Sequence, residues 1–132
     1  MPNDLKERTQ RFALDVLRFC SALPAGAEFR IIGGQLIRAG TSVGANYRAA
    51  CRSKSKADFI NKLSMVEEEA DESEYWLELV EHLSSANCAE LIRLKDEASQ
   101  LVAITVQSKK TARTADKPMT VEEHPRFAIR NS

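Results

Sequence analysis

The spacing of apolar side chains constrains this 132-residue chain more than any other feature. In four separate stretches, apolar or small residues recur alternately three and four positions apart, which is typical of a helix with one buried face. The four series run from Leu5 to Leu23, Phe29 to Ala50, Phe59 to Val80 and Leu91 to Leu101. No stretch shows sustained alternation with period two, so we expect no strands. An apolar stripe, or seam, of this kind lets the helices of a bundle pack against one another. The pattern therefore predicts an all-α fold.

Short breaks separate the four series and set their order in space. Pro24-Ala25-Gly26 cannot continue a helix, and Ser53-Lys54-Ser55 forms a second break whose last serine resembles a helix cap with Asp58. Asn87 with Glu90 resembles another cap. Because short connections place neighbouring helices antiparallel, we predict an up-down four-helix bundle. The predicted domain is 1–110, with helices at about 4–23, 27–52, 55–85 and 87–109, followed by a flexible, mostly disordered tail at 111–132.

Composition argues against several classes of protein. The chain has 19 basic and 19 acidic residues, so its overall charge favours neither a nucleic acid nor a membrane as partner. Three widely separated cysteines are typical of reduced thiols, and no apolar run approaches the ~20 residues that span a bilayer. The first eleven residues are polar, unlike a signal peptide, so we expect a cytoplasmic protein.

The sequence also offers no active site. Di-iron bundles need a Glu-x-x-His motif on each of two helices, and neither His82 nor His124 belongs to one. No serine or cysteine pairs obviously with a helical histidine, and the phosphate-loop and dinucleotide fingerprints are absent. We therefore predict no enzyme, and no catalytic residue, cofactor or metal.

Charge is segregated along the chain in a way that the balanced total hides. Six basic residues and one acid lie from Arg38 to Lys62, whereas eight acids and no base lie from Glu67 to Glu81. The basic cluster surrounds the second break, so we expect it at one end of the bundle, where it could contact phosphates. An ordinary solvated loop is the alternative. The candidate nucleic-acid-binding residues are Arg48, Arg52, Lys54, Lys56 and Lys62.

Four polar residues are predicted to stabilise the fold or the assembly, namely Arg38, Asn46, Glu67 and Glu74. Asn46 lies on the seam of its helix, where a buried asparagine commonly fixes the register and needs a partner. Glu67 and Glu74 are seven residues apart and flank the seam of the third helix. In an antiparallel hairpin about residue 53, Arg38 lies opposite Glu67 or Glu68, so we predict an ion pair there.

Small and aromatic residues mark two candidate interfaces. Gly40 and Gly44 share one face of the second helix, although glycine costs roughly 1 kcal/mol relative to alanine inside a helix. This indicates close packing, either within the chain or against another subunit. Tyr75 and Trp76 lie just beside the seam of the third helix, either to fill the core or to form a protein interface.

One segment resembles a known family. Residues 35–47, Gln-Leu-Ile-Arg-Ala-Gly-Thr-Ser-Val-Gly-Ala-Asn-Tyr, are similar to the central signature of the 23S rRNA intervening-sequence protein family. Residues 48–59 resemble that family's turn into the third helix, and residues 67–79 resemble the third helix of one subgroup. The commoner form of the family has Ile-Ala-Glu-Gly after the Asn. Tyr47-Arg48-Ala49-Ala50 stands there instead, so no acidic role is carried over.

The resemblance covers roughly residues 8–110. It implies an antiparallel up-down bundle, a ring-shaped homopentamer and no enzymatic activity. Accessory proteins of diversity-generating retroelements are distantly similar, and they bind a reverse transcriptase and nucleic acid. We predict a non-enzymatic, oligomeric binding protein that contacts RNA or another nucleic acid through its basic end. The alternative is a protein–protein adaptor or scaffold subunit with no nucleic-acid role.

Overall fold

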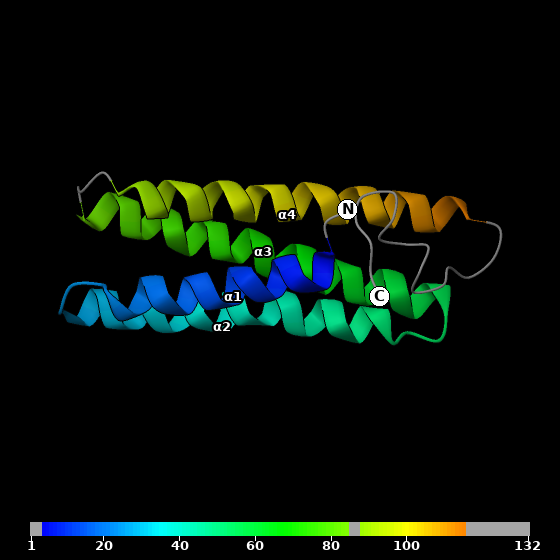
Figure 1. Cartoon of the computed structure of the whole chain (residues 1–132), viewed down its shortest axis with the longest axis horizontal. Helices are drawn as coiled ribbons and strands as arrows, with labels where there is room; N and C mark the ends of the chain where they lie inside the picture. Colours follow the sequence, from blue (N-terminus) through cyan, green and yellow to red (C-terminus); the bar gives the residue numbers. More distant parts are fainter. Residues whose placement is uncertain (1–3, 85–87, 116–132) are drawn as a thin grey trace.

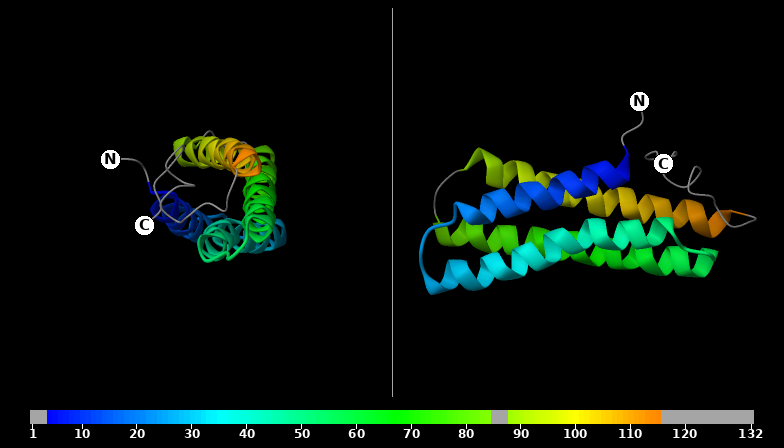
Figure 2. Two further views of the ribbon diagram at one scale, coloured as in Figure 1. Left: turned by 90° about the vertical axis from the view of Figure 1, so that its right-hand side faces the viewer. Right: turned by 60° about the horizontal axis from the view of Figure 1, so that its bottom comes forward.

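Four antiparallel helices form an up-down bundle in the computed structural model, which describes residues 4–84 and 88–115 (Figure 1). Helix α1 spans Leu5–Ser21, α2 spans Ala27–Cys51, α3 spans Lys56–Ser84 and α4 spans Ala89–Thr114. Each helix packs on the next in the chain, and α1 touches α4 through a lighter contact (Figure 2). The predicted fold class is confirmed. None of these helices is long and apolar enough to cross a membrane.

The core follows the predicted seams. Leu36, Leu63 and Leu77 are completely buried where the helices face one another. Hydroxyl side chains on the seams are also buried, and Thr9 donates a hydrogen bond of 2.8 Å to the carbonyl oxygen of Leu5, one turn earlier. Such a bond satisfies the hydroxyl donor inside its own helix, so a polar residue can occupy the core.

Helices α1 and α2 approach closely because glycines lie between them. A Cβ atom placed on Gly40 would lie 3.0 Å from two methyl carbons of Val16. A Cβ atom on Gly44 would lie 3.3 Å from the Oγ1 atom of Thr9. At these two positions the close packing indicated by the sequence is made within the chain.

The core face of α2 drifts by one residue toward its end. Asn46 is only half-buried, and its Nδ2 atom donates a 3.0 Å hydrogen bond to the carbonyl oxygen of Ser42 in the same helix. Tyr47 occupies the core instead and is 1% exposed. The prediction that Asn46 is a buried register-fixing residue is therefore corrected. A helix has 3.6 residues per turn, so a strict 3.5-residue pattern rotates away from the core over several turns.

The last helix is longer than its sequence pattern predicts. Helix α4 continues to Thr114, whereas the sequence placed its end at about 109 and assigned 111–132 to a tail. The buried face of α4 continues through Thr105, Ser108 and Ala112. Because these side chains are small or carry a hydroxyl group, the sequence does not show them as an apolar series. The remainder of the predicted tail, 116–132, lies outside the described residues.

Helices α1 and α4, the first and last of the bundle, are joined by ion pairs rather than by a wide apolar contact. Arg8 on α1 binds Glu97 on α4 through two hydrogen bonds of 2.7 and 2.8 Å. Arg93 on α4 donates a 2.9 Å hydrogen bond to Asp15 on α1. These contacts close the fourth side of the bundle, which Figure 2 shows end-on.

One helix start agrees with the capping pattern in the sequence. The hydroxyl oxygen of Ser55 accepts a 3.0 Å hydrogen bond from the backbone N–H of Asp58, which satisfies one of the free donors at the start of α3. Asn87, the other predicted cap, lies outside the described residues. The second break is therefore a tight turn that holds the end of α2 beside the start of α3.

Candidate nucleic-acid interface

The end of α2, the start of α3 and the end of α4 lie at the same end of the bundle (Figure 1). Basic residues are concentrated in these segments. Arg48 lies in the last turn of α2, Arg52 follows that helix, and Lys54 lies in the turn; all three are exposed. Lys62 lies on the second turn of α3 and is half-buried. The turn therefore gathers the sequence candidates at one end, which we call the basic end.

Lys56 differs from the other candidates because the fold already uses its charge. Its Nζ atom donates hydrogen bonds of 3.2 Å to the carbonyl oxygen of Arg113 and 2.6 Å to that of Ala115. These carbonyls belong to the C-terminal end of α4, where a cation is favoured by the helix dipole. Lys56 thus has a structural role and anchors the end of α4 against the start of α3.

The anchored end of α4 adds basic residues that the sequence analysis missed. Lys110 and Arg113 are exposed on the last turns of α4. Their neighbour Lys109 is directed inward, where its Nζ atom lies 2.7 Å from a carboxylate oxygen of Glu67 and 3.1 Å from the Ser64 hydroxyl. The Lys109-Lys110 pair was visible in the sequence. Only the extra turn of α4 and the Lys56 contact place Lys110 and Arg113 beside the α2–α3 turn.

Six cations of the basic end, of which five are exposed and Lys62 is half-buried, lack carboxylate partners within the described part of the chain. They form no ion pair with the acids at residues 4–84 and 88–115, and the members of this set are Arg48, Arg52, Lys54, Lys62, Lys110 and Arg113. A cation without a carboxylate partner keeps its full attraction for a phosphate. The basic end is therefore the part of the described surface best suited to a polyanion.

Arg38 lies away from this end and is neutralised by α3. It binds Glu69 at 3.2 Å and also Glu72, whereas the sequence predicted Glu67 or Glu68 as its partner. The antiparallel hairpin was predicted correctly, but the acid was wrong. Glu67 lies on the side of α3 that faces α4, and Glu69 and Glu72, three residues apart, share the side that faces α2.

The two neighbouring aromatic residues on α3, Tyr75 and Trp76, differ in burial. Tyr75 is 51% exposed, and its ring lies edge-on to that of Trp76 with the centroids 5.0 Å apart. Trp76 is half-buried against the core, and its ring N–H donates a 2.9 Å hydrogen bond to Glu72. This bond, together with Arg38, lowers the pKa of Glu72. Of the two interface candidates, Tyr75 is the one directed to the surface.

Glu74 is the structural polar candidate for which an ion pair is not found among the described residues. Partial burial raises the pKa of its carboxyl, and the nearby charges of Glu78 and Asp71 raise it further. Its ionised form is therefore disfavoured in the folded chain. Elsewhere in 4–84 and 88–115, no three His, Cys, Asp or Glu side chains come together as a group of metal ligands.

Comparisons with known proteins place this bundle in a family. The sequence profile described as 23S rRNA-intervening sequence protein matches residues 2–107. The chain belongs to that family. A similar fold occurs in the 1.70 Å crystal structure of a protein of unknown function from the S23 ribosomal protein family of Bacteroides thetaiotaomicron. That structure has a TM-score of 0.73 and 30% sequence identity, and the match covers 80% of this chain and 97% of the other. A comparison with curated proteins finds no match.

Proposed function

We propose that this family member is a non-enzymatic, cytoplasmic binding protein that contacts RNA through its basic end. The observation that carries the proposal is that exposed cations without ion pairs gather at one end. Arg8, Arg38 and Arg93 on the body of the bundle bind carboxylates, and Arg30 lies unpaired near the opposite end, whereas five exposed cations with no ion pair among the described residues lie together at the basic end. Backbone phosphates are the ligand that such cations attract without a specific sequence.

The fold supports this use of the basic end by holding its elements in place. The Ser55 cap fixes the start of α3, and Lys56 fixes the end of α4 beside it. Cations carried on rigid helix ends lose less conformational freedom on binding than cations on a loose loop.

Binding of a fluorescent RNA across a salt series tests the proposal. If about four phosphates are contacted, the logarithm of the association constant falls with the logarithm of salt concentration with a slope of about −3. The Arg52→Gln/Lys54→Gln variant weakens binding and makes this slope shallower. The Arg18→Gln/Arg30→Gln variant is the matched control, because it removes the same charge from exposed residues at the opposite end. Undetectable binding at low salt, or equal losses in both variants, would contradict the proposal.

We propose further that the bundle acts as a subunit of a homo-oligomer, a pentamer by resemblance to its family. Exposed apolar side chains support a subunit contact, since Leu14 and Leu17 on α1 and Tyr75 on α3 are each at least 40% exposed. Repeating the basic end around a ring would raise RNA affinity through multivalency. Size-exclusion chromatography with light scattering measures the state, and a monomer at micromolar concentration would overturn this part.

A protein–protein adaptor is the second candidate, favoured by the exposed ring of Tyr75. Tyrosine is enriched in interfaces because it offers a large apolar surface with a polar end. Partners that stay bound after nuclease treatment and are released by Tyr75→Ser would support an adaptor. Partners lost on nuclease treatment would support the RNA-binding proposal instead.

A further inference from the structure

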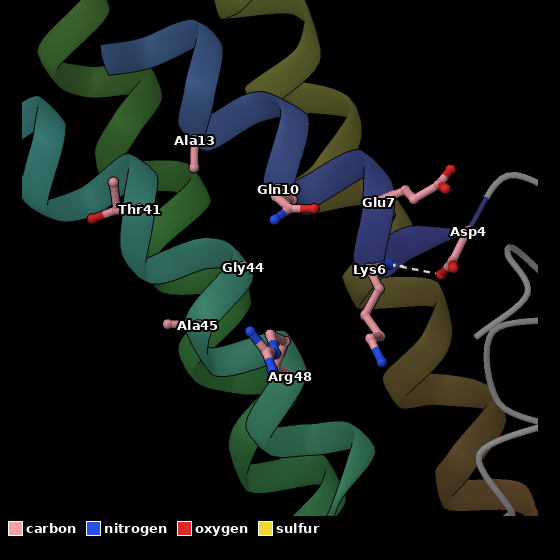
Figure 3. Close-up of a pocket in the computed structure, with 9 residues that line it drawn as sticks. All are labelled: Asp4, Lys6, Glu7, Gln10, Ala13, Thr41, Gly44, Ala45 and Arg48. Atoms are coloured by element: carbon pink, nitrogen blue, oxygen red, sulfur yellow. Dashed lines mark hydrogen bonds between the residues drawn. The ribbon is translucent and has the colours of Figure 1, made fainter. Parts of the chain in front are cut away.

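A groove of about 410 Å³ lies beside the basic end, between the start of α1 and the second half of α2 (Figure 3). α1 has 17 residues and is shorter than the other helices, so it begins before the end of the bundle is reached (Figure 1). The last turn of α2, which carries Arg48, extends past it. The groove therefore opens onto the same end of the molecule as Arg52 and Lys54.

Small side chains keep this groove open. Ala13 on α1, and Gly44 and Ala45 on α2, line it, and Ala45 is exposed. A longer side chain at Ala13, which points toward α2 in Figure 3, would fill space that is now accessible from solvent. The open volume thus follows from the same run of small residues that lets α1 and α2 pack closely.

A basic residue lines the groove on each side. Lys6 from α1 and Arg48 from α2 flank it, and neither side chain has an ion pair within the described residues (Figure 3). Two acids also line it. Asp4 accepts a 2.9 Å hydrogen bond from the backbone N–H of Lys6 and caps α1, and the Glu7 side chain points away from α2 in Figure 3.

We propose that this groove binds one strand of RNA and gives the protein a preference for single-stranded over duplex RNA. The inference rests on the proposed RNA-binding function and adds a site to it. Lys6 and Arg48 would hold a backbone phosphate from two sides. Gln10, an exposed lining residue, carries an amide that both donates and accepts, which suits a base edge or a 2′-hydroxyl.

The shape of the groove is the reason for the preference. The axes of neighbouring packed helices lie about 8–10 Å apart, so the groove on the surface between α1 and α2 is narrower than a nucleic-acid duplex. A duplex is two strands wide and presents its phosphates on a rigid cylinder, so it can contact the exposed cations of the basic end but cannot enter the groove. Affinity for a single strand therefore includes contacts that a duplex cannot make.

Paired titrations with single-stranded and duplex RNA of equal length test the inference. Wild-type protein binds the single strand more tightly. The Lys6→Gln variant lowers single-strand affinity by about threefold or more and leaves duplex affinity unchanged. Ala13→Leu, whose side chain points from α1 toward α2 in Figure 3, has the same effect by filling the groove without changing charge, and Ala103→Leu, on the exposed surface of α4, changes neither. Asp4→Asn keeps a capping side chain while removing a negative charge, and it raises single-strand affinity.

The outcomes separate the two proposals. If wild-type protein binds neither RNA, the proposed function fails. If it binds both equally, or if Lys6→Gln and Ala13→Leu affect both RNAs alike, the basic end binds RNA and the groove inference is overturned. A circular dichroism melt of each variant shows whether lost binding reflects lost folding.

Discussion

The acidic stretch of α3 and the basic end carry opposite charge, and they differ in how that charge is used. On α3, cations from neighbouring helices meet the acids: Arg38 binds Glu69 and Glu72, Lys95 binds Glu81, and Lys109 binds Glu67. At the basic end the exposed cations find no carboxylate among the described residues. In the first region four of the eight acids form ion pairs that hold helices together, whereas in the second region the exposed cations remain available to a partner.

The contrast explains how a chain with zero net charge can attract a polyanion. Ion pairs neutralise part of the charge on the body of the bundle, and the potential close to the basic end is dominated by the unpaired cations gathered there. It also predicts that neighbouring basic residues have separable effects. Paired cations should govern stability, and unpaired cations should govern RNA affinity.

The adjacent residues Lys109 and Lys110 provide the strongest test of this contrast. Lys109 is only 14% exposed in its pair with Glu67, so Lys109→Met leaves a half-buried carboxylate without its cation and lowers the free energy of unfolding by about 2 kcal/mol. Lys110→Met leaves stability unchanged and lowers RNA affinity about threefold. Urea denaturation and RNA titration of both variants measure the two effects, and identical behaviour would contradict the division.

Lys56→Met has the next largest expected effect. It removes the cation that binds the last carbonyls of α4, at a cost of about 1 kcal/mol in the free energy of unfolding. RNA affinity also falls, because Lys110 and Arg113 are no longer held beside the α2–α3 turn. Amide hydrogen exchange should rise first in the last two turns of α4. Unchanged exchange there would show that Lys56 does not anchor the helix.

Arg38→Met should lower the melting temperature by less than Lys109→Met does. Arg38 is exposed, and surface ion pairs contribute little even when two acids share one guanidinium. Arg30→Met is the control, since Arg30 is an exposed residue of the same helix with no ion pair among the described residues. A scanning fluorimetry experiment in which both variants melt together would remove Arg38 from the structural residues.

The smallest predicted effect concerns two acids on α3 with opposite pKa shifts. The pKa of Glu72 is lowered by Trp76 and Arg38, so its stabilising contribution is present above its ordinary pKa and is lost as pH falls through the lowered value. The pKa of Glu74 is raised, mainly by burial, so its ionisation opposes folding at neutral pH and this cost disappears in acid.

At pH 7, Glu72→Gln therefore destabilises and Glu74→Gln stabilises the protein, each by a few tenths of a kcal/mol because both sites are partly solvated. At pH 4 the two variants should lie closer to the wild type. Denaturation at the two pH values measures the difference. Changes of the same sign at pH 7 would contradict the assignment.

Periodicity predicted the helices, because a buried seam must recur with the helical period. It failed where the core is built from small or hydroxyl side chains, as at Thr105, Ser108 and Ala112, which lack the size that marks an apolar series. It also failed at Asn46, because a rule of alternate three and four approximates 3.5 residues per turn, whereas an α-helix has 3.6 and its core face drifts by about 20° per heptad relative to that rule.

The candidate site was predicted only in part, for a different reason. Arg48, Arg52 and Lys54 are close in sequence around one turn, so their shared location follows from topology. The role of Lys56 depends on where α4 ends in space. The position of Lys110 and Arg113 beside the α2–α3 turn depends on the same feature. Likewise, the partner of Arg38 depends on the rotation of α3, which sequence spacing does not specify to within one residue.

Lysine footprinting is the most direct test of the central claim, that the unpaired cations of the basic end bind RNA. Lysines are acetylated with and without a saturating single-stranded RNA and the products are quantified by mass spectrometry. RNA should protect Lys54, Lys62 and Lys110 and leave Lys95, which is paired with Glu81 on the body of the bundle, unchanged. Equal protection of Lys95 and the basic-end lysines, or protection confined to the body of the bundle, would contradict the account.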